Sequence, residues 1–132
     1  MRKQSKQSLS AIQRKIWVEC RRIVYERDKN PDGTIDCYTC PAKDLQGSNR
    51  QLGHGPWPKS TLGAYLKYDF RRVLRFQCAR CNLFHGGMGA EFYKRLKNEL
   101  GEGAFSQLEK DRQKTVKAMT HYIALLAEYS KL

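Results

Sequence analysis

Four of the five cysteines form two C-x2-C pairs, and this spacing constrains the fold more than any other feature of the chain. Cys37 and Cys40 make the first pair, and Cys78 and Cys81 make the second. Two residues between ligands allow a tight turn to present both sulfurs to one ion, and tetrahedral Zn²⁺ accepts two such pairs. The pattern predicts a four-thiolate structural zinc site, and its alternative is a pair of unrelated redox motifs.

Length and composition are those of a small folded protein. The chain has 132 residues, of which 40% are hydrophobic and 29% are charged, so one domain with a modest core is expected. The N-terminus is basic and lacks the apolar segment of a secretory signal, and no run of about 18 apolar residues predicts a membrane span. We therefore expect a cytoplasmic protein, a compartment in which disulfides are rare and paired cysteines favour a metal site.

The excess of positive charge indicates a polyanionic partner. The chain carries 25 Lys and Arg residues against 13 Asp and Glu, a net charge of +12, and nucleic acid is the leading candidate. Trp57, Tyr65 and Tyr68 lie among basic residues and either stack on splayed bases or pack in the core. The basic residues of this region that we expect to contact phosphates are Lys59, Lys67, Arg71, Arg72, Arg75, Arg80, Lys94 and Arg95.

An amphipathic helix is predicted from Ser8 or Ser10 to about Asp28. Its apolar positions recur at helical spacing and include Cys20, which we expect to be a small buried side chain. A polar turn at 29–33 ends the helix. This first helix is rich in Lys and Arg on its other faces, so it contributes to the basic character of the chain.

The centre of the chain predicts two short strands separated by a loop. The strand at 50–54 leads to His54, an irregular loop follows at 55–68, and a second strand at 73–76 delivers Cys78. A long irregular loop inside a compact domain is usually functional or disordered.

These elements together predict an α+β protein with a treble-clef or ββα-metal core centred on zinc. We expect one domain over 1–132. It consists of a basic N-terminal helix in 1–30, the zinc-centred core in 35–100 and one C-terminal helix over 104–130. A strand enters the first cysteine pair, and a helix begins near the last cysteine, Cys81. Because such a core is small, the free energy of zinc binding becomes folding free energy, on the order of 10 kcal/mol.

His54 is the candidate general base. It follows the first predicted strand and is flanked by Gly53 and Gly55, which we expect to leave its ring accessible to a bulky ligand. Imidazole has a pKa near 6.5 and can accept a proton at neutral pH. The alternatives are a structural or exposed histidine, or a neighbour of the zinc site. His121, in the last predicted helix, is expected to be structural or exposed.

A family resemblance covers roughly residues 35–103. It is carried by a series of short motifs in this order: Cys37-x2-Cys40, Leu52-Gly53-His54, Cys78-Ala79-Arg80-Cys81-Asn82, Gly86-Gly87 and Glu91-Phe92-Tyr93-x2-Leu96. This arrangement resembles the NinG (Rap) recombination proteins of lambdoid and related phages, which are similar to HNH endonucleases. The resemblance implies a zinc-stabilised DNA endonuclease that acts on branched or single-stranded DNA in phage recombination, in the cytoplasm of an infected bacterial host.

The resemblance also implies a second metal ion. A Mg²⁺ or Mn²⁺ ion near His54 would stabilise the phosphate charge during hydrolysis. Its candidate ligands are His85 and Asn82 on the helix, and Asp69 before the second strand. Each has a simpler alternative: an exposed helix residue for His85, a helix start for Asn82, and an ion pair with a neighbouring arginine for Asp69.

The sequence departs from the family at two positions that usually hold asparagine. Val73 stands where an asparagine would orient the catalytic histidine, and Met88 stands where a second asparagine follows the glycine pair. These departures favour a second hypothesis, a catalytically inactive zinc-fold module that binds DNA or a partner protein. A third is an interaction module whose terminal helices dock a phage or host recombination protein or a second copy of the chain.

Overall fold

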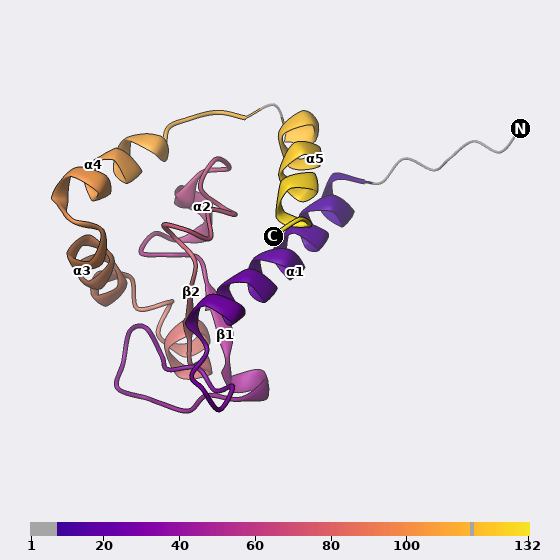
Figure 1. Cartoon of the computed structure of the whole chain (residues 1–132). Coiled ribbons are helices and arrows are strands. Elements are labelled where there is room, and N and C mark those ends of the chain that lie inside the picture. The colour runs from indigo at the N-terminus through magenta and orange to yellow at the C-terminus, as the bar shows by residue number, and fades with distance from the viewer. Residues whose placement is uncertain (1–7, 117) are drawn as a thin grey trace, which may run out of the picture.

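The computed structural model describes residues 8–116 and 118–132 and has an α+β architecture dominated by helices (Figure 1). This confirms the expected α+β class. In chain order the elements are α1 (Leu9–Asp28), the 3-10 turn η1 (Gly47–Asn49), β1 (Gln51–Gly53), α2 (Lys59–Leu62), β2 (Arg75–Gln77), the π-helical turn η2 (Arg80–Phe84), α3 (Gly89–Leu100), α4 (Glu102–Asp111) and α5 (Ala118–Tyr129).

Helix α1 has the predicted boundaries and the predicted buried face. The Ser8 hydroxyl accepts a hydrogen bond from the Ala11 amide at 3.2 Å and caps the first turn. Cys20 is fully buried, as expected, and its thiol lies 3.7 Å from the Tyr68 carbonyl oxygen. Burial raises the pKa of this thiol to about 12, so Cys20 stays neutral and acts as a core residue. The other buried positions of the helix are Ile12, Ile16 and Val24.

The two strands form a small antiparallel sheet at the centre of the molecule. Leu52 of β1 lies opposite Phe76 of β2, and both are buried. Strand β1 coincides with the predicted strand, whereas β2 begins two residues later than predicted. The difference arises because Val73 and Leu74 belong to a turn in which both amides bond to the Asp69 carbonyl. An isolated bridge between Ile35 and Leu45 replaces the strand expected before the first cysteine pair.

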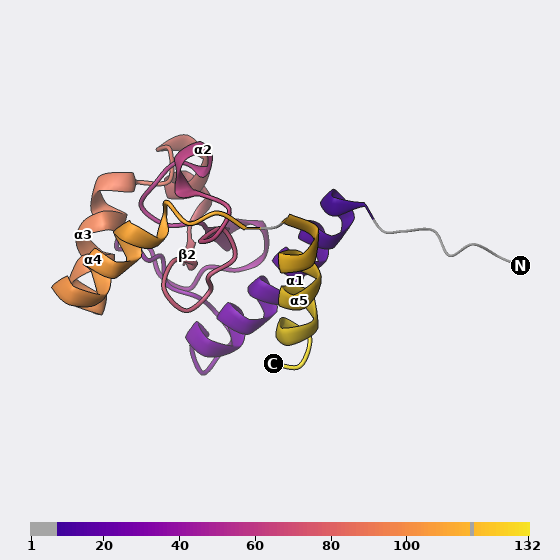
Figure 2. The same ribbon diagram turned by 90° about the horizontal axis from the view of Figure 1, so that it is seen from above.

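Two pairs of helices flank the sheet on opposite sides. Helices α1 and α5 pack together on one side, and α3 and α4 pack together on the other, in both views of the molecule (Figures 1 and 2). The loop predicted at 55–68 contains the short helix α2. Within the part of the chain that the structure describes, no helix is both long and apolar enough to cross a membrane.

The prediction of a single C-terminal helix over 104–130 is wrong. Two helices, α4 and α5, occupy this region, and residues 112–116 after α4 form a turn and a segment without regular secondary structure. Buried Asp111 ends α4 by pairing with Arg72 at 2.8 Å. Arg112 then donates a hydrogen bond to the Thr61 carbonyl and lies 4.2 Å over the Trp57 ring. These long-range contacts turn the chain away from α4, so α5 packs against α1 instead.

The aromatic residues of the central loop belong to the core. The Trp57 ring lies 5.9 Å from that of Phe105, and Tyr68 is only 4% exposed. The Tyr65 ring lies 6.4 Å from that of His121, which is half-buried. Trp57 and Tyr65 thus pack against the core, and Tyr68 lies within it.

Candidate functional site

The four paired cysteines come together at one point, as predicted. Their sulfur atoms all lie within 4.8 Å of one another. The first pair occupies a turn after Ile35, Cys78 follows β2, and Cys81 lies in η2. The sulfurs of Cys40 and Cys78 are 3.7 Å apart. A tetrahedron with metal–sulfur bonds of about 2.3 Å has edges of about 3.8 Å, so this cluster fits a bound metal ion.

Backbone and hydroxyl groups surround the sulfurs in the way that metal-bound thiolates require. The Cys78 amide donates to the Cys37 sulfur at 3.3 Å, and the Ala42 amide donates to the Cys40 sulfur at 3.4 Å. Burial raises the pKa of the Cys37 thiol, but hydrogen bonds from the Cys78 amide and from Thr39 outweigh burial and lower the pKa to about 7. At Cys81 burial dominates and raises the pKa to about 12. A metal cation among the sulfurs would supply the positive charge that keeps the Cys81 thiolate ionised.

Gln77 joins the cysteine cluster to the strand that leads to His54. Its side chain is 1% exposed, and its amide nitrogen donates to the Thr39 hydroxyl and to the Gly87 carbonyl, both at 2.8 Å. A Cβ atom on Gly53 would lie 2.1 Å from the Gln77 side-chain oxygen, so only glycine fits there. The sequence analysis did not single out Gln77, because neither its residue type nor its position signals burial.

His54 lies directly after β1 in a groove against helix α1. The ring is half-buried, and its Nδ1 atom is buried. The groove has a volume of about 560 Å³ and is lined by α1 residues together with Lys67 and Tyr68. We name it the His54 groove. The flanking glycines serve close packing and do not simply open the site, since a Cβ on Gly55 would come within 2.7 Å of the Val73 side chain.

The other two predicted catalytic residues line different cavities. The Asn82 amide donates to the Gln51 side-chain oxygen at 2.9 Å and borders a second groove of about 510 Å³, named here the Asn82 groove. His85 is exposed, accepts a hydrogen bond from Arg80 at 3.2 Å, and lies beside the cysteine cluster. Asp69 pairs with Arg72 at 2.8 Å, which confirms its simpler alternative. The structure thus separates His85 from His54, whereas the His54 and Asn82 grooves meet at Trp17.

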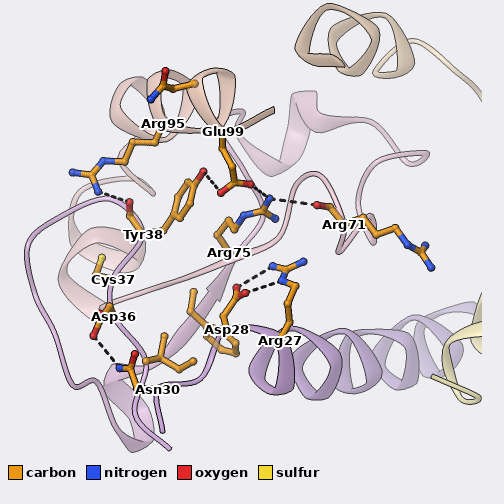
Figure 3. A pocket seen from close by; sticks show the side chains of 13 residues that line it. Arg27, Asp28, Asn30, Asp36, Cys37, Tyr38, Arg71, Arg75, Arg95 and Glu99 are labelled. Atoms are coloured by element: carbon orange, nitrogen blue, oxygen red, sulfur yellow. Dashed lines mark hydrogen bonds and ion pairs between the residues drawn. The ribbon is translucent and has the colours of Figure 1, made fainter. Parts of the chain in front are cut away.

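Three of the predicted phosphate-binding arginines line a cavity of about 840 Å³ that also contains acidic side chains (Figure 3). We call it the arginine cavity. Arg75 is buried, pairs with Glu99, and donates to backbone carbonyls. Arg95 pairs with Glu91 and donates to the Tyr38 carbonyl at 2.8 Å. Arg71 is exposed at the edge of the cavity, and its guanidinium points away from the other side chains (Figure 3).

The remaining predicted basic residues lie apart from one another. Lys67 borders the His54 groove, Arg72 pairs with Asp69 and Asp111, and Arg80 contacts His85. Lys94 is exposed on α3, and the side chain of Lys59 lies outside the described atoms. Apart from Lys94, the residues with described side chains are therefore divided among several grooves and ion pairs.

Helix α1 contributes site residues that the sequence analysis missed. Arg14 lines the His54 groove, Arg21 lines the Asn82 groove, and Trp17 lines both. Spacings of three and four residues put these side chains on one face of the helix, and this pattern was the available signal.

The chain matches no protein-family model and no curated protein, and its structure matches no solved structure.

Proposed function

We propose that this protein is a zinc-stabilised, metal-dependent DNA endonuclease of the HNH-like type that acts on branched or single-stranded DNA. The observation that carries the proposal is the position of His54. This residue directly follows the first strand of a two-stranded antiparallel sheet, and the second strand leads directly into the cysteine cluster and a helical turn. That order of elements supports a treble-clef, ββα-metal core.

Zinc is the ion that best suits the cysteine cluster. Four thiolates within reach of one point favour Zn²⁺, and they would fill its four tetrahedral coordination positions. The ion is then structural. It joins the turn that holds the first pair to β2 and η2, and it indirectly sets the position of His54.

In this proposal His54 accepts the proton of the attacking water. Because Nδ1 is buried, the other ring nitrogen, Nε2, is the one that takes the proton. Arg14 and Lys67, which border the same groove, bind the phosphates on either side of the scissile bond. A Mg²⁺ or Mn²⁺ ion, when bound with the substrate, would stabilise the negative charge that develops on the phosphate.

A cleavage assay tests the proposal. Protein with its zinc retained is incubated with labelled duplex, flap, four-way junction and single-stranded DNA, in Mg²⁺ and separately in Mn²⁺. We expect cuts with the native protein, no cuts with His54→Ala, and native cutting with His121→Ala as the matched histidine control. Cutting that persists in His54→Ala would contradict the proposed base.

A second candidate function is a nucleic-acid-binding module without catalysis. Val73 favours it, because this fully buried apolar side chain packs beside Gly55 and offers no hydrogen bond to orient His54. Among the described residues, the four cysteines are also the sole group of three or more His, Cys, Asp or Glu side chains that could hold a metal ion. The same assay decides: no cuts on any substrate, with a gel shift that fades as salt rises, supports this candidate.

A further inference from the structure

We infer that helix α1 and the segment around His54 form a track for an unpaired nucleic-acid strand, with Trp17 as the platform on which a base stacks. The inference rests on the nucleic-acid binding in the proposed function and adds the surface that would select an unpaired strand. It concerns α1, which lies outside the region of family resemblance.

The track consists of the His54 groove and the Asn82 groove, which meet at Trp17. Helix α1 forms one wall of both, and the chain from 47 to 54 contributes to the other. His54 lines one of these grooves and Asn82 lines the other, and both are residues that the sequence singled out for chemistry. A strand that occupies the His54 groove would therefore contact both Trp17 and His54.

The side chains of α1 that line the track form one stripe. Their spacing is that of a single helix face, and it is distinct from the buried face that contains Ile16 and Cys20. Trp17 is half-buried, and its ring makes a T-shaped contact with buried Tyr68 at 6.3 Å. The indole is thus held in place while it still borders both grooves. The stripe consists of Ser10, Gln13, Arg14, Trp17, Val18 and Arg21.

The chemistry of the lining matches a nucleotide strand. Arg14 and Lys67 line one groove, Arg21 and Arg50 line the other, and none of the described residues that line either groove is acidic. Cations around an aromatic ring can bind phosphates while a base stacks on the ring. In a duplex each base is already stacked and paired, so it cannot reach the indole. The track therefore favours single-stranded and branched DNA over duplex.

The first experiment compares Trp17→Leu with Trp17→Phe in the full chain with its metal bound. The probes are fluorescent single-stranded DNA and a duplex of the same sequence. We expect Trp17→Leu to weaken single-strand binding at least about fivefold, as loss of one stacked base predicts, and Trp17→Phe to restore most of it. Duplex affinity should not change, because phosphate contacts dominate it. Equal loss on both probes, or no loss on either, would overturn the inference.

A matched pair of charge variants provides a second test if Trp17→Leu does not fold. Arg14 and Lys15 are adjacent and exposed, but only Arg14 lines the track. We expect Arg14→Gln to reduce the salt dependence of single-strand binding by about 0.7 in the log–log slope, and Lys15→Gln to leave it unchanged. Equal effects of the two variants would overturn the track.

These experiments separate the inference from the catalytic proposal. Native protein that binds single strands through Trp17 but cuts nothing would contradict the endonuclease and support the track. Cutting that depends on His54, with Trp17 variants that bind and cut like native protein, would contradict the track and support the endonuclease. Absence of any nucleic-acid binding would contradict both.

Discussion

Two regions of this protein are rich in positive charge, and they differ in what their cations contact. In the arginine cavity, Arg27, Arg75 and Arg95 each pair with an acidic side chain and donate to backbone carbonyls (Figure 3). In the track along α1 no described lining residue is acidic. Within residues 8–116 and 118–132, neither Arg14 nor Arg21 has an ion-pair partner.

The difference teaches that a count of basic residues does not identify a binding surface. An arginine that already satisfies carboxylate and carbonyl oxygens must break those contacts before it can bind a phosphate. The arginine cavity therefore ties α1, β2 and α3 together, since Arg27, Arg75 and Glu99 come from these elements. Arg14 and Arg21, by contrast, border grooves in which no described lining residue is acidic, and this suits an external anion.

Loss of a metal ion from the cysteine cluster should have the largest effect on stability, because unfolding of the cluster would disrupt both the arginine cavity and the track. Cys37 lines the arginine cavity, and the cysteine cluster also positions the strand before His54. We expect a chelator or Cys81→Ser to unfold the protein, with a loss on the order of 10 kcal/mol. Circular dichroism and metal content measure this. Cys20→Ala is the matched control and should keep its metal; a folded, metal-free Cys81→Ser protein would show that the cluster is not structural.

Removal of the candidate base should have the next largest effect. It should lower DNA cleavage in the track and leave the arginine cavity and the fold unchanged. His54→Ala should lower the rate of DNA cleavage by about 10²–10⁴-fold, the usual contribution of a general base. Binding of the same DNA should be unchanged. Single-turnover cleavage and a gel shift measure the two quantities. His85→Ala lies beside the cysteines and should retain cleavage, so an equal loss in both variants would mean that the sites are not separate.

Arg75→Met should destabilise the fold without weakening DNA binding. The substitution keeps an apolar stem but removes the ion pair with Glu99 and the hydrogen bond to the Arg71 carbonyl, which costs about 1–3 kcal/mol. The Phe70 and Leu74 carbonyls still accept from Arg27. Urea unfolding measures the loss. Arg71→Met, at the exposed edge of the same cavity, is the control and should change stability by less than about 0.5 kcal/mol. A folded Arg75→Met protein with much weaker DNA binding would contradict the structural role of the cavity.

The smallest expected effect is on the salt dependence of DNA binding, and it is tested with one arginine from each region. Arg21→Gln removes a track cation and should lower the log–log salt slope of single-strand binding by about 0.7. Arg95→Gln removes a cation that pairs with Glu91, and the slope should stay as in the native protein. Fluorescence anisotropy over a range of salt concentrations measures both. The opposite order would assign the phosphate contacts to the arginine cavity.

Features that depend on local pattern were predicted well. The helix from Ser8 to Asp28, the strand at 51–53 and the meeting of the four cysteines follow the expectations closely. The helix and the strand reflect patterns among near neighbours in the chain, such as helical periodicity and a capping hydroxyl. The two cysteine pairs are remote from each other, but the two-residue spacing within each pair is local and indicates shared metal binding.

Features that depend on distant partners were not predicted. The break after Asp111 requires Arg72, and the burial of Arg75 accompanies its pairing with Glu99. The spacing of these residues in the sequence does not predict that they meet, because an ion pair between remote segments forms only when the intervening elements pack. For the same reason Trp17 was missed as a neighbour of His54.

The sequence alone determined that this is a small basic α+β protein with four cysteines placed to share one ion. Ligand spacing and amphipathic periodicity are encoded within a few residues, so no tertiary contact is needed to recognise them. Only the tertiary structure decided which arginines are paired and which side chains surround His54. Those outcomes depend on how α1 packs beside the sheet, and packing sets both the burial of a charge and the partners within its reach.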